Sequence, residues 1–189
     1  MRRAIGAAVT SAVCCLALGS CSHQADTATP ARASTSSTRT ASVSPDTSRR
    51  PTEPVMPALA KQHSTAGAKA FIRYFVSVLN YAFEAPDPRP LAHLTTSDCA
   101  FCRSLIQVTS RLKRDGGRQT HGDWRHLKLM LTGHDPQKLV FLVTGRIRPG
   151  YTQAATGGAR HAVDGGKLVD EIHVEPSTAR WRVSYLEPK

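Results

Sequence analysis

The spacing of the apolar residues changes once along this sequence, near Gly122, and this change restricts the fold class. Before Gly122 the apolar residues recur every three to four positions, which is typical of helices. After it they alternate with polar residues, which is typical of strands covered on one face. Helices followed by a run of strands favour an α+β domain with the helices packed on one antiparallel sheet.

Two long helices are expected before this change. Ser64 is a residue type that caps helix starts, and Pro86 cannot continue the first helix. The predicted ranges are 64–85, a turn with a short helix within 86–94, and a helix over 97–117 that is capped by Ser97 or Asp98. The residues expected to face the core are Phe71, Ile72, Phe75, Val76, Val78, Leu79, Ala82 and Phe83 in the first helix, and Phe101, Leu105, Ile106, Val108 and Leu112 in the last.

Four strands are expected after Gly122. Their predicted ranges are 124–132, 138–148, 167–175 and 179–187. A turn at Pro176 and Ser177 should join the last two strands into a hairpin. The segment 150–166 is long and rich in glycine, so we expect it to be an exposed loop.

The N-terminal segment has the pattern of a lipoprotein signal peptide. Arg2 and Arg3 precede an apolar run over 4–18, which is too short for a typical membrane span. The end of this run, Leu18-Gly19-Ser20-Cys21, resembles the bacterial lipobox. The resemblance implies cleavage before Cys21 and acyl chains such as palmitate on that cysteine. The alternatives are an ordinary secreted protein with an unrelated cysteine and an uncleaved membrane helix.

The anchor would hold a tether and a folded domain on the extracytoplasmic face of the cell membrane. Residues 21–55 are mostly Ser, Thr, Ala and Pro, a composition that predicts disorder with an average reach of about 30–35 Å. The folded domain, 56–189, holds 19 Lys and Arg against 11 Asp and Glu. An anionic envelope component or a small ligand is a candidate partner, and the alternative is a basic surface that is solvated and binds no such partner. Nucleic acid is not a candidate partner, because no helix or loop concentrates the basic residues.

Cys99 and Cys102 remain once the signal peptide is removed and Cys21 is lipidated. An oxidising compartment favours a disulfide, and residues three apart on a helix lie about 5–6 Å apart, which a disulfide can span. A redox pair is an alternative, although no strand precedes the motif as in thioredoxin-like units. A metal site is a further alternative, but no second ligand pair has suitable spacing.

Several of these features together resemble one known family. They are the segment PALAKQHSTAGAKAFIRYFVSVLNYA, which ends in the triplet Asn80-Tyr81-Ala82, the pair Cys99 and Cys102, and Trp181 near the end of the chain. The combination resembles an actinobacterial lipoprotein family of unknown function, DUF6318. Its element order is similar to the NTF2-like or cystatin-like cone. That analogy implies a long N-terminal helix and two further helices packed on a curved four-stranded antiparallel sheet.

Four residues are candidates for a pocket at the end of the first helix. They are Tyr74, Asn80, Tyr81 and Trp124, which could contact a ligand. The alternative is that the Asn80 amide and the Tyr81 hydroxyl satisfy nearby backbone groups. No catalytic set, metal site or cofactor is expected, because no Ser/His/Asp arrangement or phosphate-binding glycine loop is present.

Two functions remain open from the sequence. The first is a membrane-anchored, non-catalytic binding or accessory domain. The second is an NTF2-like enzyme of the isomerase or cyclase type that acts on a small extracellular molecule. The second requires a deep cavity holding a carboxylate with a raised pKa, and Asp170 and Glu171 are candidates by their position in a strand.

Overall fold

The computed structural model describes residues 51–135, 137–155, 158–178 and 180–189. The predicted signal peptide, the lipobox with Cys21 and the tether up to residue 50 lie outside the described residues. The helical elements are η1 (Ala58–Lys61), α1 (Thr65–Glu84), α2 (Pro88–His93) and α3 (Ala100–Arg114). No helix in the described part is both long and apolar enough to cross a membrane.

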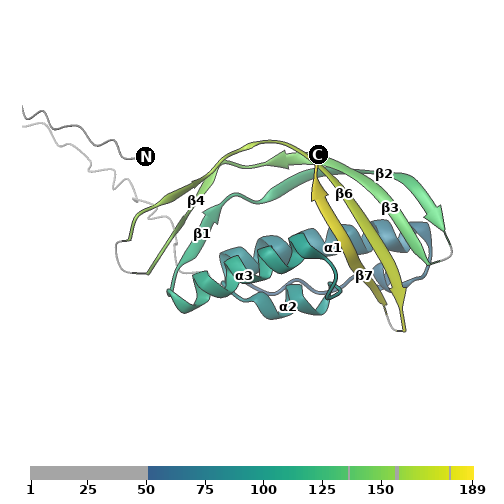
Figure 1. Cartoon of the computed structure of the whole chain (residues 1–189), viewed down its shortest axis with the longest axis horizontal. Helices are drawn as coiled ribbons and strands as arrows, with labels where there is room; N and C mark the ends of the chain where they lie inside the picture. Colours follow the sequence, from purple (N-terminus) through teal and green to yellow (C-terminus); the bar gives the residue numbers. More distant parts are fainter. Residues whose placement is uncertain (1–50, 136, 156–157, 179) are drawn as a thin grey trace, which may run out of the picture. The chain divides into compact units, whose positions relative to one another are not determined.

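Four long strands form one antiparallel sheet in the order β2-β3-β6-β7. They are β2 (Trp124–Asp135), β3 (Lys138–Ile147), β6 (Gly166–Ser177) and β7 (Arg180–Pro188). The sheet is curved, and α1, α2 and α3 lie on one of its faces (Figure 1). The predicted α+β class, with three helices on a curved four-stranded sheet, is confirmed.

A second, three-stranded sheet was not predicted. It has the order β1-β4-β5, with β1 (Arg118–His121), β4 (Gly150–Gln153) and β5 (His161–Val163). The prediction of a loop over 150–166 is therefore wrong in part, because strands of three or four residues are too short to show an alternating pattern. Gly150 lies against β1, where an added Cβ would be 2.5 Å from the backbone carbonyl oxygen of Thr120.

The predicted turn between the last two strands is also wrong. Pro176 and Ser177 belong to β6 and pair with Trp181 and Arg180 of β7. A proline is tolerated here because the pairing of β6 with β3 stops at Val174, so its missing N–H removes no ladder bond on that side.

The core lies between α1 and the inner face of the sheet. Its largest fully buried apolar side chains are Phe71, Ile72, Phe75 and Val78 of α1, Leu91 of α2, and Phe141, Val143, Ile172, Val174 and Val183 of the sheet. The inner residues of β6 alternate regularly, and Asp170 occupies one of these inner positions with only 2% of its surface exposed. A carboxyl group therefore faces the helices from the otherwise apolar inner face of β6.

Helix α3 departs from its predicted pattern. Its N-cap is Cys99 rather than Ser97 or Asp98, with the Cys99 sulfur accepting from the Cys102 N–H. Val108 is 40% exposed, whereas Thr109 is buried and donates its hydroxyl to the carbonyl oxygens one turn earlier in α3. That internal bond satisfies the hydroxyl, which explains how a threonine can replace an apolar residue on the buried face.

The start of α1 is fixed by two contacts with the chain before it. Ser64 caps the helix as predicted, accepting the Gly67 N–H at 3.1 Å. Gly67 lies so close to the preceding segment that an added Cβ would be 1.9 Å from the Gln62 carbonyl oxygen. The same oxygen accepts the indole N–H of Trp181 at 2.9 Å. Gln62 thus links the start of α1 to β7.

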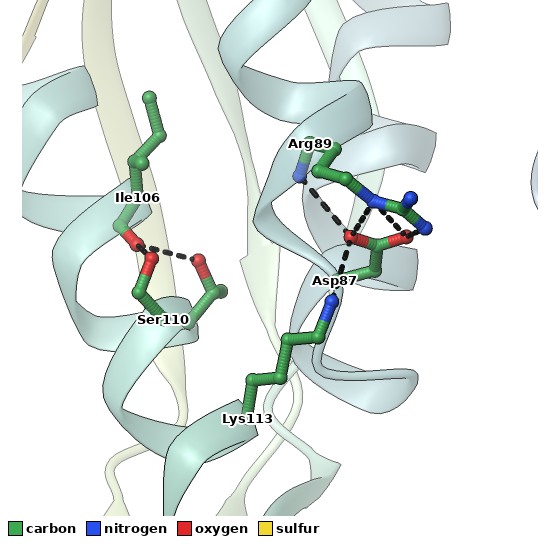
Figure 2. A network of polar contacts seen from close by, with 6 residues as sticks. Asp87, Arg89, Ile106, Ser110 and Lys113 are labelled. Atoms are coloured by element: carbon green, nitrogen blue, oxygen red, sulfur yellow. Dashed lines mark hydrogen bonds and ion pairs between the residues drawn. The ribbon is translucent and has the colours of Figure 1, made fainter.

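A network of ions joins α2 to the end of α3 (Figure 2). Asp87 caps α2, and its two carboxylate oxygens accept from Arg89 at 2.9 and 2.7 Å. Lys113 of α3 lies 3.7 Å from the same carboxylate. The Arg89 hydrogen bonds lower the pKa of Asp87 to about 2, against a partial opposing effect of burial. Asp87 therefore stays ionised and holds the two helices together.

Candidate functional site

A cavity of about 340 Å³ lies between α1, α3 and the two sheets. Its wall is mainly apolar, and includes Leu79, Phe83, Phe101, Leu105, Trp124 and Leu168. Small-molecule pockets typically measure about 300–1,000 Å³ and have apolar walls with a few polar groups. The cavity therefore has the size and the lining of a small-ligand site.

Asp170 is a buried carboxyl group in the wall of this cavity. Its Oδ2 atom has no hydrogen-bond partner among the residues described. Burial raises the pKa of Asp170 to about 6, because the ionised form is poorly solvated between apolar neighbours. The group can therefore accept a hydrogen bond when ionised and can exchange a proton near neutral pH.

Two of the four predicted pocket residues lie in the cavity wall. Asn80 and Trp124 both line it. The Asn80 side-chain amide accepts a hydrogen bond from the Trp124 N–H at 3.0 Å and donates one to the Trp124 carbonyl oxygen at 3.2 Å. Tyr74 and Tyr81 do not line it. Tyr74 packs against the core, and burial followed by the charge of Glu53 raises its pKa. The Asn80 amide thus satisfies the hydrogen-bonding groups of the Trp124 backbone, which was the alternative to ligand contact, and Asn80 also lines the cavity.

Cys99 and Cys102 form a disulfide at the start of α3. The Cα atoms of Cys99 and Cys102 are 5.2 Å apart, and the residues are only 1% and 0% exposed. Buried sulfurs are poorly placed for thiol exchange, which needs access to an attacking thiolate. The disulfide fixes the first turn of α3, from which Phe101 enters the cavity wall.

The second acidic candidate, Glu171, is held by other residues of the sheet. Its carboxylate lies 2.9 Å from the His173 ring and 3.4 Å from Lys189. The His173 hydrogen bond is the main reason that the pKa of Glu171 is lowered. Within the described ranges no three His, Cys, Asp or Glu side chains come close enough to bind a metal. Of the two acidic candidates, only Asp170 lines the cavity.

The comparisons with known proteins place the chain in a family. The profile of the family of unknown function DUF6318 matches residues 47–184. The chain belongs to this family. No curated protein matches the sequence. The match confirms the predicted membership of DUF6318, and that membership assigns no activity to the cavity.

Solved structures align with this DUF6318 domain at low sequence identity. The intermembrane space region of the chloroplast protein ARC6 aligns with a TM-score of 0.54 and 10% identity, over 67% of this chain and 97% of that one. A protein of unknown function with a cystatin-like fold from Nostoc punctiforme aligns at 0.40 and 11%, over 67% and 93%. An NTF2-like protein from Novosphingobium aromaticivorans aligns at 0.37 and 13%, over 67% and 90%.

The importance of Asp170 in this DUF6318 domain was only weakly indicated by the sequence. The alternation of β6 contained the signal, because Asp170 shares its phase with Leu168, Ile172 and Val174, which are all buried. A carboxylate in phase with buried apolar residues is rarely structural unless it is paired. The contribution of α3 to the same cavity could not be read from β6 alone.

Proposed function

We propose that the domain binds a small, largely apolar molecule in the cavity, and that the Asp170 carboxyl group is its main polar contact. One observation carries this proposal: Asp170 lines an otherwise largely apolar wall, and its buried Oδ2 atom has no hydrogen-bond partner among the described residues. Burial of such a group is unfavourable unless something donates a hydrogen bond to it. A hydroxyl or amine group on the ligand supplies that donor, while the rest of the ligand replaces water along the apolar wall.

The proposed ligand class follows from the charge state of Asp170. At a pH above its pKa of about 6, Asp170 is a carboxylate that accepts hydrogen bonds and favours a neutral donor or a cation. Lys167 and Lys189 also line the cavity, but the Lys189 ammonium is already paired with the carboxylates of Glu171 and Glu187, so Asp170 and Lys167 leave the wall without a net positive charge. The ligand we propose is therefore an apolar alcohol or amine rather than an acid, because the carboxylate would repel an anion at close range.

A fluorescent probe of this class tests the binding function. N-Phenyl-1-naphthylamine is apolar, carries one N–H donor and becomes brighter out of water. We expect it to bind, and we expect Leu105→Trp, which fills the cavity, to abolish binding. Val108→Trp is the matched control, since Val108 lies on the exposed side of the same helix. Equal loss of binding in both variants, or none in either, contradicts the proposal.

We further propose that the domain is carried by a lipid anchor on Cys21, on the extracytoplasmic face of the cell membrane. The support is the basic start, the apolar run and the lipobox-like ending of the N-terminal segment. One acyl chain holds a protein only weakly, whereas two or three hold it stably. Mass spectrometry of the mature protein should find an acylated Cys21 at the N-terminus, and Cys21→Ser should release the protein from membranes. An unmodified N-terminus contradicts the anchor.

Acid–base catalysis is the second candidate function, favoured by the raised pKa of Asp170. A general base works best when its pKa lies near the working pH, and about 6 meets that condition. The reaction class would be proton transfer next to a carbonyl group on a small apolar substrate. Loss of α-deuterium from labelled 2-tetralone tests it, with Asp170→Asn as the control. Deuterium loss that is faster than in buffer with the wild type, but not with Asp170→Asn, supports catalysis. Equal rates of deuterium loss in all three samples leave binding as the function.

A further inference from the structure

Four exposed arginines lie at the end of the domain that holds the second sheet. Arg111 and Arg114 are in the last turn of α3, Arg118 begins β1, and Arg160 precedes β5. None of the four has an ion-pair partner within the part of the chain that the structure describes. We call these four residues the basic end.

Contacts between their segments bring the four residues together at this end of the domain. The N–H of Ala155 donates to the carbonyl of Asp115 at 3.2 Å, so the segment after β4 packs on the end of α3. Arg118 pairs with Gln153 across β1 and β4, and the Arg160 Nε atom donates to the Gln153 side chain at 3.2 Å. Figure 1 shows β1 and β4 side by side, with β1 following directly from α3.

The helix dipole explains only half of this cluster. Cations are favoured in the last turn of a helix, which accounts for Arg111 and Arg114. Arg118 lies in the second sheet and Arg160 just before it, so neither gains from that effect. The nearby acidic residues are Asp115, Asp164 and Glu84, which lines a cleft with Arg118; all three are exposed, and against four arginines they leave the surface net positive. By contrast, the carboxylates of Asp87 and Asp123 are each held by two basic groups.

The chain that leads back to Cys21 leaves the described domain beside this surface. Pro51, the first described residue, lines a cleft together with Arg118. About thirty residues separate Pro51 from Cys21, which gives an average reach of about 30 Å for a flexible segment. If Cys21 carries the anchor proposed above, on which this inference rests, the basic end lies within reach of the lipid headgroups.

We propose that the basic end docks on anionic phospholipid headgroups of the membrane that holds the anchor. The planar guanidinium group of arginine can bind two phosphate oxygens at once, which makes it well suited to this partner. The tether raises the local concentration of the domain at the membrane, so several weak contacts suffice for docking. The cavity shares Asn80 and Gln119 with the cleft beside Arg118, so docking holds the cavity near the membrane surface.

Vesicle sedimentation of an unlipidated chain tests this docking. The protein is the mature chain, residues 21–189, with Cys21→Ser, so that binding reports the surface and not the acyl chains. It is mixed with phosphatidylcholine vesicles that contain or lack phosphatidylglycerol, at low and at high salt. We expect binding only with phosphatidylglycerol, and we expect high salt to reverse it, because salt screens exposed charges.

Charge-removing variants locate the surface. Replacing Arg114, Arg118 and Arg160 together by Gln should weaken vesicle binding about tenfold or more. The matched control replaces Lys61, Lys128 and Arg180 by Gln, which removes the same charge from exposed positions in η1, β2 and β7. Circular dichroism confirms that both variants fold. Equal binding to the two kinds of vesicle, or equal loss in the two variants, overturns the proposal. A failed lipidation of Cys21 affects neither result, so the two proposals fail separately.

Discussion

The side-chain amide of Asn80 is hydrogen-bonded to both backbone groups of Trp124. Its Oδ1 accepts the Trp124 N–H at 3.0 Å, and its Nδ2 donates to the Trp124 carbonyl oxygen at 3.2 Å. Asn80 lies near the end of α1, and Trp124 is the first residue of β2. The pair therefore fixes the distance between the long helix and the start of the sheet, and both residues form part of the cavity wall.

Asn80→Asp should destabilise the fold with almost no change in size. The new carboxylate loses the donor and places negative charge against the Trp124 carbonyl oxygen. Loss of a partly buried hydrogen bond of this kind costs about 1–3 kcal/mol, measurable by urea unfolding. Ser77→Ala is the control, because the Ser77 hydroxyl makes an exposed bond within α1. A variant as stable as the wild type would show that the pair does not hold the wall.

Gly67→Ala should destabilise the domain more than an ordinary helix substitution. Alanine is the better helix former, but its Cβ would be 1.9 Å from the Gln62 carbonyl oxygen. The backbone must move, which also strains the Trp181 bond to the same oxygen. We expect a loss of about 2–4 kcal/mol in the free energy of unfolding. Ala66→Ser, at the exposed neighbouring position, should have an effect within about 0.5 kcal/mol.

Asp170→Asn should stabilise the protein at alkaline pH. The folded-state pKa of Asp170 is raised to about 6 from 3.8, so the folded state favours the protonated form. Above pH 6 the group is ionised in both states and its burial destabilises the fold. That cost is relieved as the pH falls through 6 toward 3.8. The neutral amide avoids it, so urea unfolding at pH 8 should show a gain of about 2–3 kcal/mol.

This gain should shrink as the pH falls. At pH 4 the wild-type carboxyl is largely protonated in the folded state, and the variant should lose most of its advantage. Glu171→Gln is the control with the opposite sign, since the hydrogen bond from His173 lowers the pKa of Glu171. An Asp170→Asn protein that is less stable than the wild type at pH 8 would contradict the absence of a partner for this carboxyl group.

Asp87→Asn should destabilise the protein at neutral pH but not in strong acid. The folded-state pKa of Asp87 is lowered to about 2 from 3.8, chiefly by the Arg89 hydrogen bonds. The stabilisation of the folded state by the Asp87 carboxylate is therefore present above pH 3.8 and is lost as the pH falls through 2. Because Arg89 is largely exposed, we expect only about 1–2 kcal/mol at pH 7. An equal difference at pH 7 and pH 2 contradicts the ion network as its cause.

The sequence predicts the long elements of this domain well because their patterns are strong. Helix α1 repeats its apolar residues over five turns between a capping serine and a proline, β3 contains a continuous apolar run, and β6 alternates apolar and polar residues. Their bounds match the predicted ranges within about two residues, the usual error at element ends. The burial of α1 also follows its sequence, because every apolar residue expected to be inside is buried except Phe83, which lines the cavity.

The elements that the sequence fails to predict depend on tertiary contacts. The strands β1, β4 and β5 are short, and they exist because Gly150 allows β4 to approach β1. The burial of Thr109 depends on a bond within α3. The cavity itself needs α3 to lie apart from β6, a distance that no local pattern encodes. Asp170 could be predicted to face inward, but only the packing shows that it meets a cavity rather than an apolar neighbour.

A carbon-13 NMR titration of the Asp170 carboxyl group tests the central claim most directly. The free protein should show an Asp170 pKa near 6, and saturation with N-phenyl-1-naphthylamine should lower it, because an N–H donor favours the ionised form. The carboxyl of Asp87, whose pKa the Arg89 hydrogen bonds lower to about 2 and which does not line the cavity, should titrate identically with and without the probe. An Asp170 carboxyl that titrates near 4, and does not respond to the probe, would contradict a ligand site built on this residue.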